Sequence, residues 1–212
     1  LGNLGFIGKF RIRQMLREVR TGFTVIFGMF ISLLVMMLAI DCYVLCENIS
    51  MENKADTRYE YMYTYKYPQK EVPKGGEACY METLSKEAYG YQLDVTMVGI
   101  DNNNPYFKAK PEKGKNKIVI ASATAQKFGL KKGDKLILED RINDMDYAFT
   151  VEDIVPYSVG LYVFMDIDSM RELFGQQEAY FNAVLSSGQL NIDPGRLYAV
   201  TTKEDISKSS EV

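Results

Sequence analysis

Residues 21–40 read TGFTVIFGMFISLLVMMLAI, a run of 20 residues without a charge between Arg20 and Asp41. At about 1.5 Å of rise per residue, a helix of this length spans roughly 30 Å, the thickness of the hydrocarbon layer of a bilayer. The run is apolar on every side of such a helix, whereas a surface helix of a water-soluble domain carries polar residues on one side. We therefore predict a membrane-spanning helix over residues 23–46.

A cleaved signal peptide is the main alternative for an apolar segment near the N-terminus. Signal peptides have apolar cores of about 7–15 residues and end in small residues at the cleavage site. This run is longer, and the sequence LAID precedes Cys42, so an acid stands where a lipoprotein signal has a small residue. The segment is thus predicted to remain in the protein.

Charge is distributed unevenly on the two sides of the apolar run. Residues 1–22 carry five cations against Glu18 alone, a net charge of +4, which leaves −7 for the other 190 residues. Cytoplasmic flanks of membrane helices carry the excess of Lys and Arg. We therefore expect a protein of the plasma membrane with its N-terminus in the cytoplasm and its main domain outside.

Residues 1–22 are predicted to form an amphipathic basic helix. Apolar residues recur at Ile12, Met15, Leu16 and Val19, and a second face carries Lys9, Arg13, Arg17 and Arg20. Two interpretations stay open: the helix lies in the anionic inner surface of the membrane, or it docks on a cytoplasmic protein. No DNA-binding motif accompanies the cations, so no nucleic-acid partner is expected.

The composition excludes much catalytic chemistry. The chain has no His, and so it has no Ser-His-Asp or Cys-His nucleophile and no His-liganded metal. Its cysteines, Cys42, Cys46 and Cys79, are too few for a disulfide framework. Cys42 and Cys46 share one face of the predicted helix and are interpreted as small apolar residues of it. We expect no catalytic residue, metal or cofactor, and hence a protein that is not an enzyme.

From residue 47 onward the sequence predicts an α+β domain that ends near residue 206. Residues 47–58 read as a stalk or a helix extension, and Glu77–Leu84 is either a strand or a helix. Further strands are predicted at Tyr91–Ile100, 118–120, Lys135–Glu139, Tyr147–Val155, Gly160–Asp166, Tyr180–Ser186 and Leu197–Thr202. Short helices are predicted at 121–130, ended by Gly129, and at Ser169–Phe174, capped by Asp168. The sheet is expected to be mixed or antiparallel.

Five tyrosines alternate with other residues in the stretch YEYMYTYKY: Tyr59, Tyr61, Tyr63, Tyr65 and Tyr67. Strict period-two alternation of a strand-forming residue predicts a strand with all five rings on one face. One interpretation is a platform on which a ligand such as a sugar stacks. The other, which we favour, is a half-buried sheet face whose hydroxyls reach water.

Two pairs of acids are the nearest approach to a catalytic constellation. Asp144 and Asp146 lie in a predicted turn, and Asp166 and Asp168 lie at the predicted start of a helix. Turn and cap positions account for such residues without catalysis.

Three stretches, together with the basic segment and the apolar run before them, give the sequence a family resemblance. They are IVIASATAQKFGLKKGDKLIL (118–138), FTVEDIVPYSVGLYVFMDIDSMRELFG (149–175) and VTTKEDI (200–206). In this order behind one apolar helix, they resemble the FtsX-like (MacB-type) permease subunits of ABC transporters. In that family the last stretch leads into the next membrane helix.

The resemblance implies a non-catalytic membrane subunit that works with a separate cytoplasmic ATPase and with further membrane spans of the same permease. It also implies that the outer domain transmits ATP-driven motion to an outer partner or substrate. Only one span is present, so we expect residues 207–212 to be the lead-in to a further membrane helix. The alternative is a single-span membrane-anchored binding or sensor protein that uses the tyrosine platform.

Overall fold

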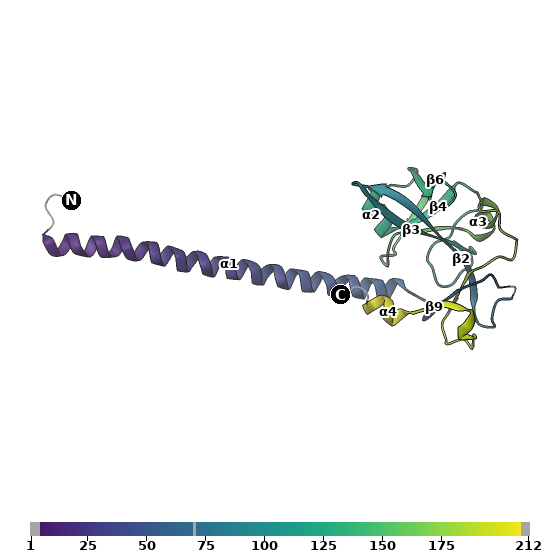
Figure 1. Ribbon diagram of the computed structural model, residues 1–212, viewed down its shortest axis with the longest axis horizontal. Helices are drawn as coiled ribbons and strands as arrows, with labels where there is room; N and C mark the ends of the chain where they lie inside the picture. Colours follow the sequence, from purple (N-terminus) through teal and green to yellow (C-terminus); the bar gives the residue numbers. More distant parts are fainter. Residues whose placement is uncertain (1–4, 70, 209–212) are drawn as a thin grey trace. The chain divides into compact units, whose positions relative to one another are not determined.

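The computed structural model describes residues 5–69 and 71–208, apart from the side chains of residues 20, 50 and 53. The chain divides into two compact units, Leu1–Glu47 and Asn48–Val212. Figure 1 follows the chain through both units, from the purple N-terminal helix to the yellow C-terminal strand and helix.

A single helix, α1 (Phe6–Asp56), supplies all the secondary structure of the first unit and continues into the second. No proline interrupts its 51 residues. It contains the whole predicted span, and the stretch that follows is a helix extension as far as Asp56. Among the described residues, it is the one helix with the length and apolar composition to cross a membrane.

Six strands of the second unit close into a barrel, because one long strand pairs at both ends of the strand order. The order is β3-β7-β4-β6-β5-β2, and β2 also pairs with β3. The bounds are β2 (Glu77–Ala88), β3 (Tyr91–Ile100), β4 (Lys117–Ala121), β5 (Lys135–Asp140), β6 (Met145–Val155) and β7 (Tyr162–Asp166). β3–β7 and β4–β6 are parallel and the other pairs are antiparallel, so the sheet is mixed as expected.

A smaller antiparallel sheet shares strand β2 with the barrel. Its order is β2-β8-β1-β9, with β1 at Tyr61–Tyr65, β8 at Ala183–Ser186 and β9 at Leu197–Thr202. β2 pairs with β8 only through Glu77–Cys79, and its later residues pair within the barrel. Where β2 changes partners, the Asn182 side chain accepts a hydrogen bond from Met81 N (2.8 Å) and donates one to Met81 O (2.7 Å).

Two apolar cores fix the arrangement of the barrel and the smaller sheet. The first fills the barrel and includes Leu136, Leu138 and Phe149. The second joins Val119 and Phe164 of the barrel to Ala183 and Leu185 of β8. Since one continuous core links the barrel to the sheet, the second unit is a single packed body.

The short helices begin and end at identifiable capping residues. α2 (Ser122–Phe128) ends at Gly129, whose φ of 64° is the left-handed conformation that glycine adopts easily. α3 (Ile167–Leu173) is capped by Asp166, which accepts hydrogen bonds from Ser169 N (2.9 Å) and Ser169 Oγ (2.8 Å). The predicted cap, Asp168, is wrong: the helix begins two residues earlier, because Asp166 already ends β7 with its carboxylate turned toward Ser169.

The expected α+β class is confirmed, and so are most strand positions. The undecided stretch at Glu77–Leu84 is part of β2, and the strands predicted at Lys135–Glu139 and Tyr147–Val155 pair with each other as β5 and β6. After β9 the chain enters α4 (Lys203–Lys208), while residues 209–212 of the predicted lead-in lie outside the described residues. The closure of the barrel was not expected, since it depends on pairing between β2 and β3 on one side and β2 and β5 on the other.

Candidate functional site

The basic side chains predicted to face the membrane or a partner project from the first turns of α1. Lys9, Arg13 and Arg17 recur at every fourth residue, and no ion pair found among the described residues includes them. Arg20 lies in the same helix, but its side chain is outside the described residues. Uncompensated cations on one side of a helix attract anionic lipid or acidic protein.

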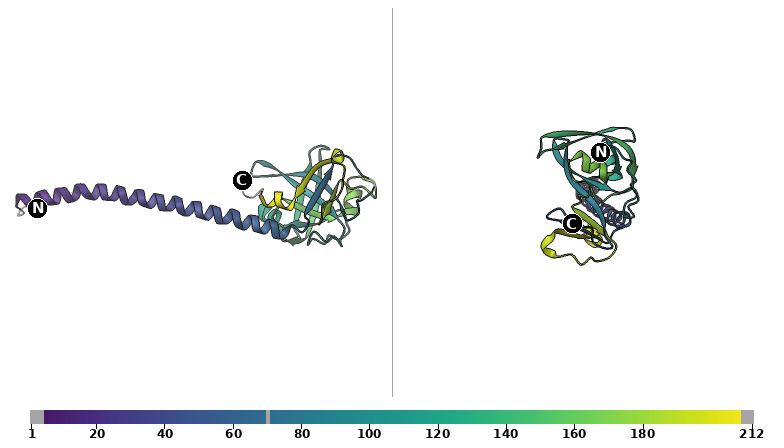
Figure 2. Two further views of the ribbon diagram at one scale, coloured as in Figure 1. Left: turned by 90° about the horizontal axis from the view of Figure 1, so that it is seen from below. Right: turned by 90° about the vertical axis from the view of Figure 1, so that its right-hand side faces the viewer.

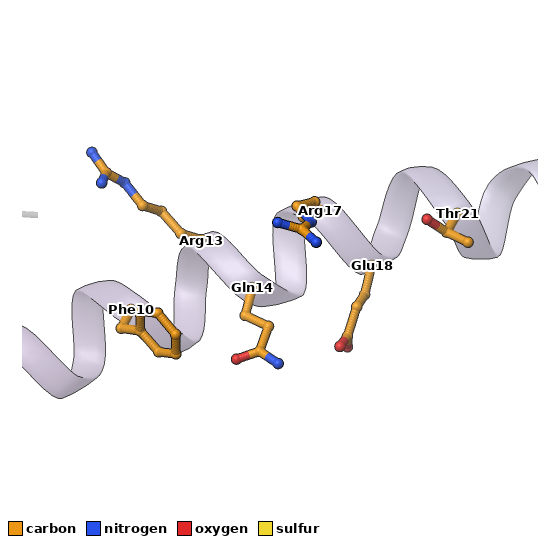
Figure 3. Close-up of a pocket in the computed structure, with 6 residues that line it drawn as sticks. All are labelled: Phe10, Arg13, Gln14, Arg17, Glu18 and Thr21. Atoms are coloured by element: carbon orange, nitrogen blue, oxygen red, sulfur yellow. The ribbon is translucent and has the colours of Figure 1, made fainter.

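A shallow hollow of about 760 Å³ follows this part of α1 and is lined by Phe10, Arg13, Gln14, Arg17, Glu18 and Thr21. Figure 3 shows Arg13 pointing away from Gln14 and Glu18. All six side chains come from one helix, so the hollow is the space between neighbouring side chains. It is not an enclosed pocket of the kind that binds small ligands.

The small residues of the apolar part of α1 share one side of the helix. At about 100° of rotation per residue, Gly28, Ser32, Ala39, Cys42 and Cys46 fall on that side, together with the larger Ile31 and Val35. The other side carries large side chains, and a groove of about 470 Å³ there is lined by Phe30, Leu33, Leu34, Met36, Met37 and Ile40. The hydroxyl of Ser32 donates a hydrogen bond to the backbone oxygen Gly28 O (3.0 Å), so it has a hydrogen-bond partner within the helix itself. Small residues are typical of helix contacts within membranes, and large apolar ones of lipid contacts.

The end of α1 makes two side-chain contacts within the second unit, both through Asp56. Asp56 Oδ1 lies 3.4 Å from Lys108 Nζ, and Asp56 Oδ2 accepts a hydrogen bond from Ser158 Oγ (3.5 Å). The Asp56 side chain is only 12% exposed. We call Asp56, Lys108 and Ser158, together with the rings described next, the junction.

Aromatic rings lie beneath these polar contacts. Phe107 packs against Tyr59 (5.9 Å between ring centroids), Tyr157 (5.6 Å) and Phe164 of β7 (4.9 Å). The Tyr59 and Tyr157 hydroxyls are 3.5 Å apart. Burial raises the pKa of both tyrosines, so both stay neutral. These rings connect the segment that follows α1 to the wall of the barrel.

The first and the last strand of the second unit lie side by side. β1 pairs with β9 from Tyr61↔Thr202 to Tyr65↔Leu197, and Lys203 N donates to Glu60 O (3.0 Å). The Thr202 hydroxyl and amide hydrogen-bond to Asp205 and lower the pKa of that carboxyl, which holds the first turn of α4. Lys208, and to a smaller extent Lys54 of α1, lower the pKa of Glu204.

The five tyrosines of the predicted platform do not share one open face. Tyr59, Tyr63 and Tyr65 are buried, Tyr61 is half-buried, and Tyr67 is exposed. Leu190 N donates to the Tyr63 hydroxyl (2.9 Å), because the segment after β8 covers this face of the sheet. The ligand platform stays a prediction, and only Tyr61 and Tyr67 have ring surface left for it.

The two acidic pairs lie in an ion-paired helix start and in a turn. Asp168 pairs with Arg171 (3.0 Å) and Lys113 (3.6 Å), while Asp144 lies in the β5–β6 turn with a φ of 53°. No group of three or more His, Cys, Asp or Glu side chains suited to a metal ion is found in the described ranges.

Apart from Tyr59, which was predicted as part of the tyrosine platform, the junction residues were not singled out from the sequence. A usable signal was present: an aromatic residue directly follows a proline in both loops that meet there, at Pro105-Tyr106-Phe107 and Pro156-Tyr157. A proline restricts the backbone and so fixes where the next ring points.

No protein-family model matches the chain, and no curated protein matches it. Solved structures do match. The extracellular domain of the noncanonic ABC-type transporter YknZ from Gram-positive bacteria is 13% identical, with a TM-score of 0.37 over 62% of this chain and 83% of that one. The periplasmic region of MacB from Actinobacillus actinomycetemcomitans is 6% identical, with a TM-score of 0.40 over 74% of this chain and 94% of that one.

These two structures are transporter domains from outside the cytoplasm. Identities and TM-scores as low as these leave the function of the chain to be argued from its own residues.

Proposed function

We propose that the chain is part of an FtsX-like (MacB-type) ABC transporter permease of the plasma membrane. Residues 1–22 form its cytoplasmic basic helix, residues 23–46 its membrane span and residues 47–206 its extracytoplasmic domain, with residues 207–212 leading to a further membrane helix. The subunit is non-catalytic. It couples a separate cytoplasmic ATPase to an extracytoplasmic substrate or partner.

One observation carries this proposal: the chain enters and leaves the outer domain on adjacent strands. β1 follows α1, β9 precedes α4, and the two strands pair over their whole length. A domain with this topology fits between two neighbouring membrane helices without distortion of its core. A sensor domain on a single span has no need for its last strand to return to its first.

The junction supports a role in transmitting motion. Asp56 is held by Lys108 and Ser158, and the rings beneath it reach β7 of the barrel. Because packed interiors are stiff, a tilt of the last turns of α1 moves the barrel instead of bending the connection. Nucleotide-driven movement at the cytoplasmic end would in this way reach the outer domain.

The two faces of α1 support partners within the membrane. The remaining spans of the permease would pack on the side of Gly28, Ser32 and Ala39, where helix backbones can approach closely. Phe30, Leu33 and Met37 on the other side would meet lipid tails.

The proposal is tested in the full-length parent transporter by reversing charges on the basic helix. Replacing both Arg13→Glu and Arg17→Glu is expected to lower substrate-stimulated ATPase activity at least several-fold, because both cations lie on one side of the helix. Arg11→Glu is the matched control, since it makes the same charge change about 160° around the helix from Arg13. Equal effects of Arg11→Glu and Arg13→Glu would contradict a directed docking face.

Reading the gene beyond Val212 separates the two candidate functions. The permease requires a further apolar run of about 20 residues soon after α4. A stop codon at that point would instead favour the single-span binding protein, with the exposed ring of Tyr67 as part of its ligand site.

A further inference from the structure

The tip of the β2–β3 hairpin presents two aromatic rings to solvent. Tyr89 is 85% exposed and Tyr91 is 74% exposed. Tyr89 has a φ of 55° and Gly90 a φ of 77°, so a bulky aromatic residue occupies a left-handed position where Asn, Asp or Gly is usual. Backbone strain is often found at functional sites, so a strained turn with an exposed ring is a candidate for a binding surface.

Lys86 near the tip of this hairpin contacts α2 and β5, and four further lysines, Lys127, Lys131, Lys132 and Lys135, lie along the segment that runs from α2 to the start of β5. Lys86 Nζ lies 5.7 Å from the ring centroid of Phe128 in α2 and donates to Ile137 O of β5 (3.4 Å). The hairpin, the end of α2 and the start of β5 therefore meet. We call the set the hairpin-tip surface: Lys86, Tyr89, Tyr91, Lys127, Lys131, Lys132 and Lys135.

The lysines of the hairpin-tip surface make no close ion pair, although Lys132 is near enough to Glu112 to contribute to the lowered pKa of that carboxyl. None of the five takes part in the ion pairs found in residues 5–69 and 71–208. The nearest acids in sequence are Glu87, Asp94 and Asp134, and Asp134 is engaged as the acceptor for Lys131 N (2.8 Å). The surface is thus a basic patch on a domain whose net charge is negative.

The hairpin-tip surface lies on the side of the second unit where the last turns of α1 enter. Ser122 at the start of α2 donates to Tyr157 O (3.1 Å), and the next residue, Ser158, contacts Asp56. Both views of the second unit agree that α2 and the β2–β3 turn lie on the side of Asn48–Asp56 (Figures 1 and 2). Ten residues of helix, a length of about 15 Å, separate Asp56 from the end of the predicted span at 46.

We infer that the hairpin-tip surface binds anionic lipid headgroups on the outer face of the bilayer. Lysines on long stems attract the phosphates, and exposed tyrosines place their rings at the level of the headgroups with their hydroxyls in water. Contact at this surface would attach the outer domain to the membrane at a second point, in addition to α1. This inference rests on the proposed crossing of the membrane by α1.

The absence of tryptophan from the chain makes a direct test simple. Tyr89→Trp supplies a single fluorescent reporter at the tip, and the full-length chain is reconstituted in nanodiscs of phosphatidylcholine with or without phosphatidylglycerol. We expect a blue shift of the emission, and quenching by headgroup spin-labelled lipid, only in the anionic discs. Adding salt to about 1 M, where the Debye length is about 3 Å, should remove both effects.

Two matched variants locate the contact. Ile142→Trp reports from the β5–β6 turn, where the side chain is 91% exposed. β2 and β5 are antiparallel, so this turn lies at the opposite strand end from Tyr89, and its emission should not depend on lipid. In the Tyr89→Trp background, Lys131→Glu should abolish the shift, and Arg141→Glu should leave it unchanged.

Three results would overturn the inference. If the emission of Tyr89→Trp does not depend on anionic lipid, the inference is refuted, and an acidic protein becomes the candidate partner of this surface. Equal shifts in neutral and anionic discs would refute the role of the lysines. Failure of α1 itself to enter the bilayer is seen separately, as loss of the chain from the disc fraction, and would refute the proposed function as well.

Discussion

Phe107 is the residue on which the junction depends most directly. Its side chain is buried, and it contacts Tyr59, Tyr157 and Phe164 at centroid distances of 5.9, 5.6 and 4.9 Å. Replacing a buried phenylalanine by alanine costs about 3–5 kcal/mol, because transfer free energy is lost and a cavity remains. We therefore expect Phe107→Ala to lower the free energy of unfolding of the outer domain by about 4 kcal/mol.

The corresponding fall in Tm follows from the size of the domain. For about 160 residues, each kcal/mol shifts Tm by about 2–4 °C, so the expected fall is roughly 8–16 °C. Near-ultraviolet circular dichroism is the suitable probe, since α1 dominates the far-ultraviolet signal while most of the 15 tyrosines report on the outer domain. Ile142→Ala, at a site 91% exposed, is the control and should change stability by no more than about 0.5 kcal/mol.

A milder pair of variants isolates the ring contact itself. Phe107→Leu and Tyr59→Leu keep apolar volume in the core, and a double-mutant cycle between them should give a coupling free energy of about 0.5–1.5 kcal/mol. A coupling near zero, or a Phe107→Ala variant as stable as the Ile142→Ala control, would refute the view that this ring connects the end of α1 to the barrel.

Further predictions concern α3 and one half-buried acid. Asp166→Ala should lower the free energy of unfolding by about 2 kcal/mol, because the hydrogen bonds that cap α3 at Ser169 are lost, whereas Asp168→Ala should lower it by less than about 1 kcal/mol. Equal losses for the two variants, measured by unfolding in urea, would contradict Asp166 as the cap. Burial, together with the charge of Asp140, raises the pKa of Glu82, with the hydrogen bond from Tyr80 opposing the shift. Protonated Glu82 therefore contributes most stability below the ordinary pKa of a glutamate, and this contribution is lost as pH rises through the raised pKa. Because Gln stays uncharged, Glu82→Gln should be more stable than the parent protein at pH 7 and equally stable at low pH. Melting curves across that pH range check this, and parallel curves for the two proteins would contradict it.

The sequence predicts those parts of the fold that depend on local pattern. The apolar run predicted the membrane-length part of α1, the position of Gly129 predicted the end of α2, and the period-two alternation of tyrosines predicted β1. Each of these features is decided by residues close together in the chain, so a short window contains the necessary information.

The remaining features depend on contacts between distant residues. Closure of the barrel needs β2 to reach both β3 and β5, and the burial of Tyr63 needs the segment near Leu190 to fold over it. The junction likewise brings together Asp56, Lys108 and Ser158 from three separate segments. The Asp168 error has a local cause, because two aspartates two residues apart are equally good caps until the end of β7 is known.

Labelling of single cysteines in intact cells tests the central proposal most directly. In the full-length parent, Cys42→Ala and Cys46→Ala are combined with replacement of any cysteine outside residues 1–212. Cys79 is kept, since it is buried and burial raises the pKa of its thiol to about 12, so it will not react. With a membrane-impermeant maleimide, Ile142→Cys is expected to be labelled in intact cells and Arg11→Cys only after permeabilisation. Labelling of Arg11→Cys in intact cells, or protection of Ile142→Cys until the membrane is opened, would contradict the proposed topology.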